Sequence, residues 1–560
     1  MNSFDYGVAL LFSLLVLSLG MMFSGSGKSM KSFFAAGGAV PWWVSGLSLF
    51  MSFFSVGTFV VWGSIAYTDG FVSVAIQTTM AIAGIIIGFV VAPAWNKTKA
   101  ITAAEFISKR LGDSVQRKYS FIFLFINLFT AGAFLYPVGK IIEVTTGMPL
   151  EAAIIALGIF VIAYTAVGGL WAVLVTDVLQ FVVLSAAVII VIPLSLNMVG
   201  GPSEFLNKLP EGFTALHNEQ YTWVFLAAFL IYNTVFIGGN WAYVQRYTSV
   251  SSPRNARKVG WLFAGLYLVA PAIWMIPPMV YRLINPGLSG TEAEDAYLLM
   301  SMEVVPNGLL GLVLGAMIFA TASSVNTTIN IAAGVWTNDI YGHFKKSVTA
   351  LESMFVARIS TLVFGVLAIA VALMVQNMGG IVEVVLSVGA LTGAPIYLPP
   401  IWAIFSKRQT GISILATTFI SLAINLFFKF VSPTLLDFGL SRSMEMLVGA
   451  LTPIAILALF EMFYRAKGNA NPDYDAYVIH QQERVDAEQR LSAEDNSNDD
   501  SANDHALKMI AIGVGSIGVL IVALGALTDS ANVETITVGL LVCIPALLLL
   551  KPVKHFIKKS

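Results

Sequence analysis

A run of hydroxyl and amide side chains interrupts a long apolar segment, GLLGLVLGAMIFATASSVNTTINIAAGVWTNDIY, at residues 308–341. The spacing of this run places one set of polar residues on the same side of a helix. This polar stripe consists of Ser323, Asn326, Thr327 and Asn330. Neutral oxygen atoms suit a hard cation of low charge. Small polar residues also bond back to their own helix or join neighbouring helices. Two interpretations are therefore open, an ion site and a helix-packing surface.

A second polar cluster lies inside another long apolar segment, PWWVSGLSLFMSFFSVGTFVVWGSIAY, at residues 41–67. Ser52, Ser55 and Gly57 stand at its middle, and the segment is longer than a membrane crossing requires. This composition permits an unwound stretch of helix, and the carbonyl groups that unwinding frees can coordinate an ion. The pattern predicts a broken membrane helix.

Asp177 is the one carboxylate in the apolar segment LWAVLVTDVLQFVVL. An acid inside a membrane helix is expensive to bury and indicates a functional site. The alternative is a hydrogen-bonded Asp near the membrane interface, which has only a structural role.

The composition as a whole indicates a polytopic membrane protein surrounded by lipid. Of 560 residues, 57% are hydrophobic and 11% are charged, whereas soluble domains contain about 25% charged residues. The net charge of −1 gives no reason to expect nucleic acid as a partner. A single cysteine, Cys543, excludes a disulfide framework and a cysteine-based metal site.

About fifteen apolar segments are long enough to cross a membrane. They lie near 5–24, 40–67, 70–93, 119–142, 150–167, 171–199, 222–249, 256–284, 304–342, 354–377, 380–406, 409–431, 443–465, 508–528 and 535–551. Lys and Arg gather in alternate loops, which places the N-terminus outside and the C-terminus in the cytoplasm. The polar segment 466–507 carries ten acids and three bases and is predicted to be a cytoplasmic, partly disordered linker.

Four stretches in this order resemble motifs of the sodium:solute symporter family, which includes the sodium/galactose and sodium/sialic acid symporters. They are FFAAGGAVPWWVSGLSLF, ITAAEFISKRLG, AVGGLWAVLVTDVLQ and ASSVNTTINIAAGVWTNDIY, and the similarity covers most of residues 30–410. The resemblance implies an all-α protein of a bacterial inner (plasma) membrane, with a LeuT-like core of five plus five helices in inverted orientation. The expected division is 1–39 (first helix and inner loop), 40–199 (first repeat), 200–221 (outer loop), 222–406 (second repeat), 407–465 (peripheral helices), 466–507 (acidic linker) and 508–560 (last helices and basic tail).

The resemblance also implies a set of sodium ligands. The main site would use the backbone carbonyls of Met51, Phe54 and Ala320 and the hydroxyls of Ser323 and Ser324. A second sodium site, or a relay for sodium leaving to the cytoplasm, would use Asp177, Ser323, Asn326 and Thr327. Asn326 departs from the family, which more often has a small hydroxyl residue there.

The positions that line the galactose site in sugar-specific relatives match six residues here, namely Thr58, Gln77, Asn233, Phe236, Tyr267 and Ser387. An acid of the galactose pattern is replaced by Gln77 and a basic residue by Tyr267, so galactose is not the expected solute. Amides, hydroxyls and aromatic faces still suit a polyhydroxylated compound. Arg246 follows the pocket helix, and we expect it to be an interfacial base at a cytoplasmic helix end. The alternative is that it meets an anionic group.

These features predict a non-enzyme that takes up a small polar solute together with Na+ by alternating access. A sugar, sugar acid or polyol is the expected solute, and an amino acid or organic carboxylate is the alternative. A membrane sensor that binds solute without moving it is a second class of protein. Its signalling domain would have to lie in 466–507, which has too little apolar content to fold.

Overall fold

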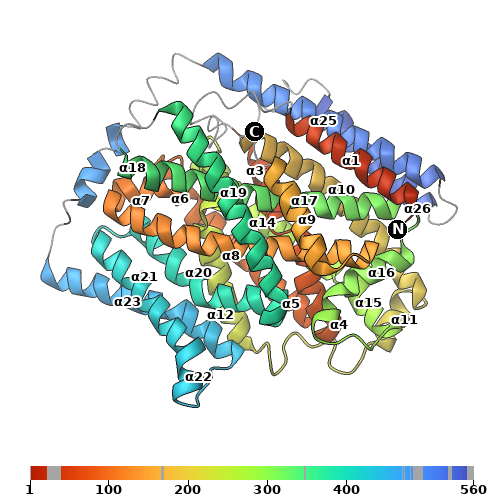
Figure 1. Ribbon diagram of the computed structural model, residues 1–560, viewed down its shortest axis with the longest axis horizontal. Coiled ribbons are helices and arrows are strands. Elements are labelled where there is room, and N and C mark those ends of the chain that lie inside the picture. The colour runs from red at the N-terminus through yellow and green to blue at the C-terminus, as the bar shows by residue number, and fades with distance from the viewer. Residues whose placement is uncertain are drawn as a thin grey trace.

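The computed structural model describes residues 2–21, 40–164, 170–345, 349–468, 471, 473–479, 481–483, 496–527 and 532–550, and all regular structure in these residues is helical (Figure 1). Within the described residues, ten helices are long and apolar enough to cross a membrane, or up to eleven if the bent pair Trp223–Gly239 and Trp241–Thr248 is one span. Four shorter apolar helices accompany them. Each predicted membrane segment coincides with one of these helices or with a broken helix.

The first half of the core begins after the peripheral helix α1 (Ser3–Met21). Its elements are α3 (Trp42–Met51), η2 (Thr58–Trp62), α4 (Gly63–Asp69), α5 (Val72–Ile86), η3 (Ile87–Val91), α6 (Ala92–Thr98), α7 (Ala103–Leu111), α8 (Asp113–Thr146), α9 (Leu150–Tyr164) and α10 (Leu170–Met198). The short helix α11 (Pro202–Lys208) follows in the connection to the second half.

The second half repeats this order of elements. It comprises α12 (Trp223–Gly239), α13 (Trp241–Thr248), α14 (Pro253–Trp274), α15 (Ile276–Ile284), η4 (Gly290–Asp295), α16 (Ala296–Val304), α17 (Leu309–Val335), η5 (Trp336–Tyr341), α18 (Gly342–Phe344), α19 (Ala350–Val375), η6 (Gln376–Met378) and α20 (Ile381–Phe405). Outside the core lie α21 (Gly411–Leu426), η7 (Phe427–Val431), α22 (Ser432–Leu435), α23 (Arg442–Lys467), α25 (Asn496–Leu527) and α26 (Asn532–Leu550).

The two halves pack in matching ways. Each starts with a broken helix, α3 with α4 in the first and α12 with α13 in the second, where the bend is 63°. The first helix of each half packs on the last of the same half, α3 on α10 and α12 on α20. It also packs across the halves, α3 on α14 and α12 on α5. This exchange of equivalent contacts is what five helices repeated in inverted orientation produce.

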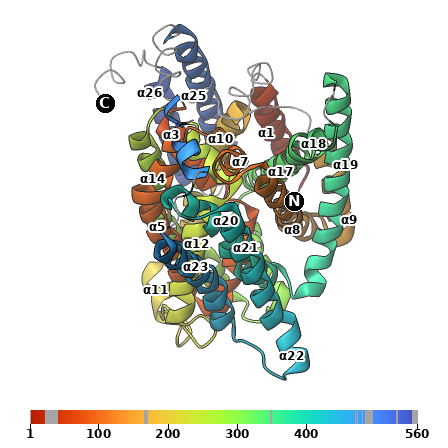
Figure 2. The same ribbon diagram turned by 90° about the vertical axis from the view of Figure 1, so that its left-hand side faces the viewer.

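The peripheral helices lie on two sides of this core. In Figure 1, α25 and α26 form a hairpin beside α1 at the upper right, where they pack on α10. Helices α21 and α23 flank α20 on the opposite side, and Figure 2 shows α19 along another edge. Helix α25 begins at Asn496, inside the predicted acidic linker, and residues 484–495 lie outside the described part of the chain.

Helix α1 is fastened to the start of α17 by a buried acid. The Asp5 carboxylate accepts hydrogen bonds from the backbone N–H groups of Gly308 (2.6 Å) and Gly311 (3.2 Å). It therefore satisfies donors that a helix N-terminus leaves open. A Cβ on Gly311 would lie 2.1 Å from the Asp5 carbonyl oxygen, so the two backbones touch. Glycine at this position is required by the close approach.

A second buried acid joins the loop element η4 to the core. Glu294, only 2% exposed, accepts a hydrogen bond from the Ile381 N–H at the start of α20 (2.8 Å). It also accepts one from the Tyr136 hydroxyl on α8 (3.1 Å). Next to it, Lys140 pairs with Asp295 at 3.1 Å. The loop is thus held to both halves of the core.

The Glu294 carboxyl should make stability depend on pH. Burial raises its pKa from 4.5 to about 7, although the donors from Ile381 and Tyr136 and the charge of Lys140 oppose that shift. Between these two values the folded protein holds a proton that the unfolded chain has released. The free energy of unfolding therefore falls as the pH rises through this window. We expect Glu294→Gln to flatten the decrease in melting temperature between pH 5 and pH 8.

The matched control is Glu303→Gln, since Glu303 is an exposed acid on the neighbouring helix α16. Melting temperatures of the purified proteins across the pH range test the prediction. A Glu294→Gln variant with the same pH slope as the wild type and the control would contradict it.

Candidate functional site

Two adjoining cavities open where the broken helices meet α8, α17 and α20. The larger has a volume of about 170 Å³ and the smaller about 50 Å³. Both are lined by Ser52, Thr130, Phe134 and Tyr243, so these side chains form their common boundary. The larger cavity reaches α12 and α20, whereas the smaller one reaches α10 and α17.

The break after α3 frees backbone carbonyl groups beside the smaller cavity. In a continuous helix the Ser55 N–H would donate to the Met51 carbonyl, but here it donates to Phe53 (2.9 Å). The Thr58 N–H likewise donates to the Ser55 carbonyl (3.0 Å) and not to Phe54. Met51 and Phe54, the predicted carbonyl ligands, have thus lost their regular helical donors. The predicted unwound stretch is confirmed.

Thr321 on α17 holds the broken segment in place, a role that the residue pattern did not predict. Its buried hydroxyl accepts a hydrogen bond from the Val56 N–H (3.1 Å) and donates to the Met317 carbonyl (3.1 Å). The α17 helix thereby replaces the helical partner that Val56 would otherwise have. Its position in the run of hydroxyl and amide residues of α17 was the only signal in the sequence.

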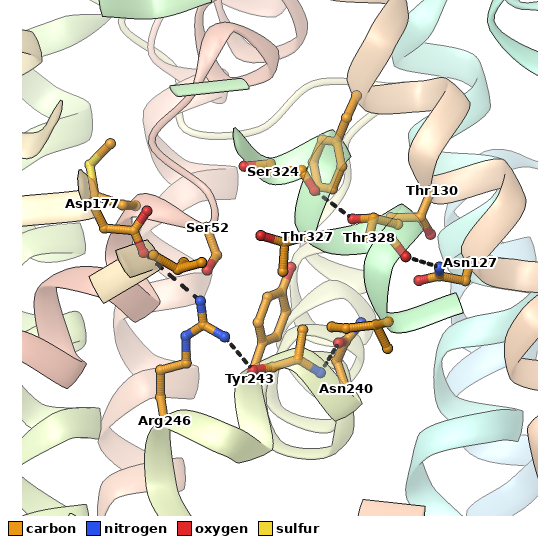
Figure 3. A pocket seen from close by; sticks show the side chains of 15 residues that line it. Ser52, Asn127, Thr130, Asp177, Asn240, Tyr243, Arg246, Ser324, Thr327 and Thr328 are labelled. Carbon is orange, nitrogen blue, oxygen red and sulfur yellow. Dashed lines mark hydrogen bonds and ion pairs between the residues drawn. The ribbon is translucent and has the colours of Figure 1, made fainter. Parts of the chain in front are cut away.

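Several of the predicted sodium ligands come together at the smaller cavity. Met51, Ser324, Thr327 and Asp177 line it, as Figure 3 shows for the last three. The Ser324 hydroxyl donates to the carbonyl of Ala320 at 3.3 Å, so one further predicted ligand is in contact with the cavity lining. Hydroxyl and carbonyl oxygens of this kind fit a hard monovalent cation.

Four predicted cation-site residues are not placed at this cavity, and Ala320, which contacts Ser324, is one of them. The side chain of Ser323 lies outside the described part of the structure. Phe54 belongs to the broken segment but is not among the residues that line either cavity. Asn326 is also absent from the lining, and its side-chain oxygen accepts a hydrogen bond from Asn330 at 3.0 Å. A second cation at Asp177 and Thr327 would therefore lack the Asn326 ligand in this arrangement.

Asp177 has a buried basic partner, which corrects the expectation for Arg246. Arg246 is 3% exposed, and its Nη2 lies 3.9 Å from the Asp177 Oδ2 (Figure 3). Ser48 joins the two, because its hydroxyl donates to Asp177 Oδ2 (2.5 Å) and accepts from Arg246 Nε (3.2 Å). Arg246 does lie in the last turn of α13, but it is buried and paired with Asp177, so the prediction of an interfacial base is wrong. The 63° bend between α12 and α13 places the last turn of α13 against α3 and not in the inner loop.

The larger cavity is lined by three of the six predicted solute contacts, Thr58, Asn233 and Phe236. The other three have partners elsewhere. Gln77 accepts a hydrogen bond from the Trp274 indole (3.0 Å), and Tyr267 is buried against Phe50 and Phe263. Ser387 donates to Glu383 (2.6 Å) and accepts from Lys429 (3.1 Å), on the side of α20 that meets the peripheral helices.

Aromatic side chains form much of the wall of the larger cavity, and the sequence analysis did not select most of them. They are Phe53, Trp62, Phe129, Phe134, Phe229, Tyr232, Phe236, Tyr243 and Tyr397. On α12 the rings of Phe229 and Tyr232 lie 5.4 Å apart, and those of Tyr232 and Phe236 also 5.4 Å apart. The spacing of three and four residues in the sequence was a signal that predicts this aromatic face.

Tyr232 is held against α20 by two glycines. A Cβ on Gly393 would lie 2.3 Å from a carbon of the Tyr232 ring, and one on Gly389 would lie 3.0 Å from it. Both glycines line the larger cavity. The ring therefore occupies a notch in α20, which fixes its position in the wall.

The larger cavity has few polar groups, and several of them already form hydrogen bonds within the protein. Thr130 and Thr392 donate their hydroxyl protons to carbonyl groups of their own helices, and Thr58 donates to Phe53. Asn233 donates to Thr79 at 3.0 Å, which leaves its carbonyl oxygen to accept. Among the described residues that line this cavity, none carries a charge.

Comparisons with known proteins agree with this architecture. A model of the sodium:solute symporter family matches residues 33–420. Sodium/glucose cotransporter 1 of Ovis aries is 28% identical over 456 residues, which cover 73% of this chain and 68% of that protein. The sodium/sialic acid symporter SiaT of Proteus mirabilis is 26% identical over 434 residues, 73% of this chain and 87% of its own.

Among solved structures, the substrate-bound, outward-open state of a Na+-coupled sialic acid symporter is similar, with a TM-score of 0.69 and 21% sequence identity. The alignment covers 82% of this chain and 98% of that one. At this level of identity the likeness shows the fold, which is the LeuT-like arrangement of five plus five helices.

Proposed function

The chain belongs to the sodium:solute symporter family, and we propose that the solute it moves with Na+ is a small neutral sugar or polyol. The observation that supports this class is the lining of the larger cavity, where aromatic faces and the amide of Asn233 stand without a charged side chain among the described residues. Burying an unpaired carboxylate there would carry a large desolvation penalty. Sugar acids, amino acids and organic carboxylates are therefore disfavoured relative to neutral hydroxylated compounds.

We place the coupling Na+ at the break after α3, with the carbonyls of Met51, Phe54 and Ala320 and the hydroxyls of Ser323 and Ser324 as ligands. Cation binding there joins the first half of the core to α17. Solute in the adjoining cavity joins the same broken helix to α12 and α20, and the two repeats then rock against one another. Na+ and solute act together because both contact the segment around Ser52, and Ser52 lines both cavities.

One Na+ per cycle is enough for strong accumulation. Its inward movement across about 100 mV contributes about 2.3 kcal/mol. A tenfold sodium gradient adds about 1.4 kcal/mol. Together they support a solute gradient of several hundredfold. The buried Arg246 already compensates the charge of Asp177, so we assign Asp177 and Thr327 to the exit path of Na+ and not to a permanent second site.

We propose a bacterial inner membrane location with the N-terminus outside and the C-terminus in the cytoplasm, because basic residues gather in the loops assigned to the inner face. Counterflow of labelled solute in proteoliposomes tests the whole assignment. A symporter exchanges label in the presence of Na+ and accumulates it when a sodium gradient is imposed. A solute-binding sensor binds the label without moving it, and a channel shows no dependence on the sodium gradient.

Asn233→Ala should weaken solute binding by about 5- to 150-fold, as expected for one lost buried hydrogen bond of about 1–3 kcal/mol. Sodium affinity without solute should change little, because Asn233 lines only the larger cavity. Thr234→Ala is the matched control, since Thr234 is adjacent on α12 and donates to the Leu230 carbonyl of its own helix (2.9 Å). Both affinities should be measured on one preparation. Equal losses of sodium and solute affinity in Asn233→Ala would show that the residue acts on the fold.

A further inference from the structure

The lining of the larger cavity is uneven in polarity. Hydroxyl side chains gather at the helix break, where Ser52, Ser55 and Thr58 line it. Helix α20 contributes mainly aliphatic side chains, Ile381, Val384, Val385 and Val388. A solute in this cavity therefore meets hydrogen-bonding groups from one direction and hydrocarbon from another.

The aromatic face of α12 continues the apolar part. The rings of Tyr232 and Phe236 are nearly parallel, with an angle of 16° between their planes, and Gly389 and Gly393 fix Tyr232 against α20. The wall formed by α12 and α20 thus presents flat rings next to valine side chains. Such a wall suits the C–H face of a sugar ring together with an alkyl substituent.

A hydroxymethyl group placed against the valine side chains would lose hydrogen bonds to water there, because the valine side chain has no donor or acceptor. The hydroxyls of Thr392 and Thr130, which also line the cavity, already donate their protons to helix carbonyls and can only accept. An unsatisfied buried hydroxyl is unfavourable, whereas a methyl group at the same place is favoured by burial. The cavity therefore discriminates between two sugars that differ only at this substituent.

On the basis of the proposed function, we propose that the solute is a neutral deoxy sugar, a hexose in which a methyl group replaces the hydroxymethyl group. The methyl group lies against Val384, Val385 and Val388 on α20, and the ring hydroxyls point to Asn233 and the helix break. The proposed solute is one member of the class of neutral sugars, and the transport cycle is unchanged.

Matched pairs of sugars test this directly, because the members of each pair differ by one oxygen atom. The pairs are L-fucose with L-galactose, L-rhamnose with L-mannose, and 6-deoxy-D-glucose with D-glucose. Sodium-dependent binding to the full-length protein in nanodiscs is measured for each, with D-glucuronate and D-galacturonate as charged probes. In the pair whose ring configuration fits, the deoxy sugar should bind about 5- to 150-fold more tightly than its partner, and the charged probes should not bind.

The outcomes separate this inference from the function on which it rests. Equal or tighter binding of the hydroxymethyl sugars with Na+ would overturn the deoxy assignment and leave neutral sugar uptake intact. Sodium-dependent binding of a charged probe would overturn the proposed solute class itself. So would the failure of every sugar in the three pairs to bind.

Variants on α20 give a second, independent readout. Val388→Thr and Val385→Thr keep the shape of the side chain and add a hydroxyl group to the aliphatic patch. Each should reduce the preference for the deoxy sugar, because the added hydroxyl oxygen can accept a hydrogen bond from the hydroxymethyl group. Val382→Thr is the control, because Val382 is on the same helix but does not line the cavity. An unchanged ratio of the two affinities in both lining variants, with folded protein confirmed by its melting temperature, would also overturn the assignment.

Discussion

Arg246→Met should remove most of the folded protein, and adding Asp177→Asn should recover it. The two side chains are buried together, with 3.9 Å between Nη2 and Oδ2, and Ser48 bonds to both. Removing one partner of a buried ion pair typically costs about 3–5 kcal/mol, because the remaining charge has no compensation. This is a large share of the 5–15 kcal/mol that holds a typical protein folded. Neutralising both partners removes the stranded charge.

Thermal unfolding followed by size-exclusion chromatography on detergent extracts measures this effect. Arg254→Met is the matched control, since Arg254 is an exposed base at the start of α14. A single Arg246→Met variant as stable as the wild type would contradict the buried pair. A double variant no more stable than the single one would show that Arg246 acts through packing and its bond to the Ala242 carbonyl (2.7 Å).

This pair also decides how Asp177 has to be tested for a role in sodium exit. Asp177→Asn alone leaves the buried guanidinium of Arg246 without a counter-charge, so instability and a lost relay would appear together. In the double neutral variant the charge balance is restored, and only the relay is missing. Normal solute binding with slow turnover in that variant supports a relay. Normal turnover with unchanged sodium dependence excludes an ionic role for Asp177.

The sequence predicted the features that depend on local pattern. The break in the second apolar segment follows from Ser52, Ser55 and Gly57, and Ser324 belongs to the polar run at residues 321–330. The position of Arg246 depends instead on contact between α13 and α3, segments some 200 residues apart. The rule that places basic residues in inner loops acts on loop charge as a whole. It carries no information about an arginine such as Arg246, which the bend between α12 and α13 places inside the core.

The predicted solute contacts also depended on contacts between helices that are distant in the sequence. Ser387 is adjacent in sequence to Val388, which lines the cavity, but one residue turns a helix by about 100°. Ser387 therefore meets Lys429 and Glu383 on another side of α20. Gln77 is bonded to Trp274 on α14, a partner that no local pattern specifies. Matching positions to relatives selects the helices that form a pocket more reliably than the side chains that enter it.

Ser324→Ala should weaken sodium binding by about 5- to 150-fold, which corresponds to the loss of about 1–3 kcal/mol for one buried polar partner. Ser324 lines the smaller cavity with Met51, and its hydroxyl is in contact with the Ala320 carbonyl. Alanine keeps the helix, so the fold should survive and the loss should be specific to the cation. The solute need not be known, because a cation that binds only the folded state stabilises it by RT ln(1 + [L]/Kd).

Sodium-induced stabilisation therefore gives the measurement. At a sodium concentration of about 100 times the wild-type Kd, the wild type gains about 2.7 kcal/mol. A variant with fiftyfold weaker affinity gains about 0.7 kcal/mol under the same conditions by that relation. Ser360→Ala is the control, since Ser360 donates to the Val356 carbonyl of its own helix α19 (2.8 Å) and lines neither cavity. Potassium at equal concentration accounts for ionic strength. If Ser324→Ala retains the full wild-type response to sodium, then the polar run of α17 packs helices together, and the coupling ion binds elsewhere in the core.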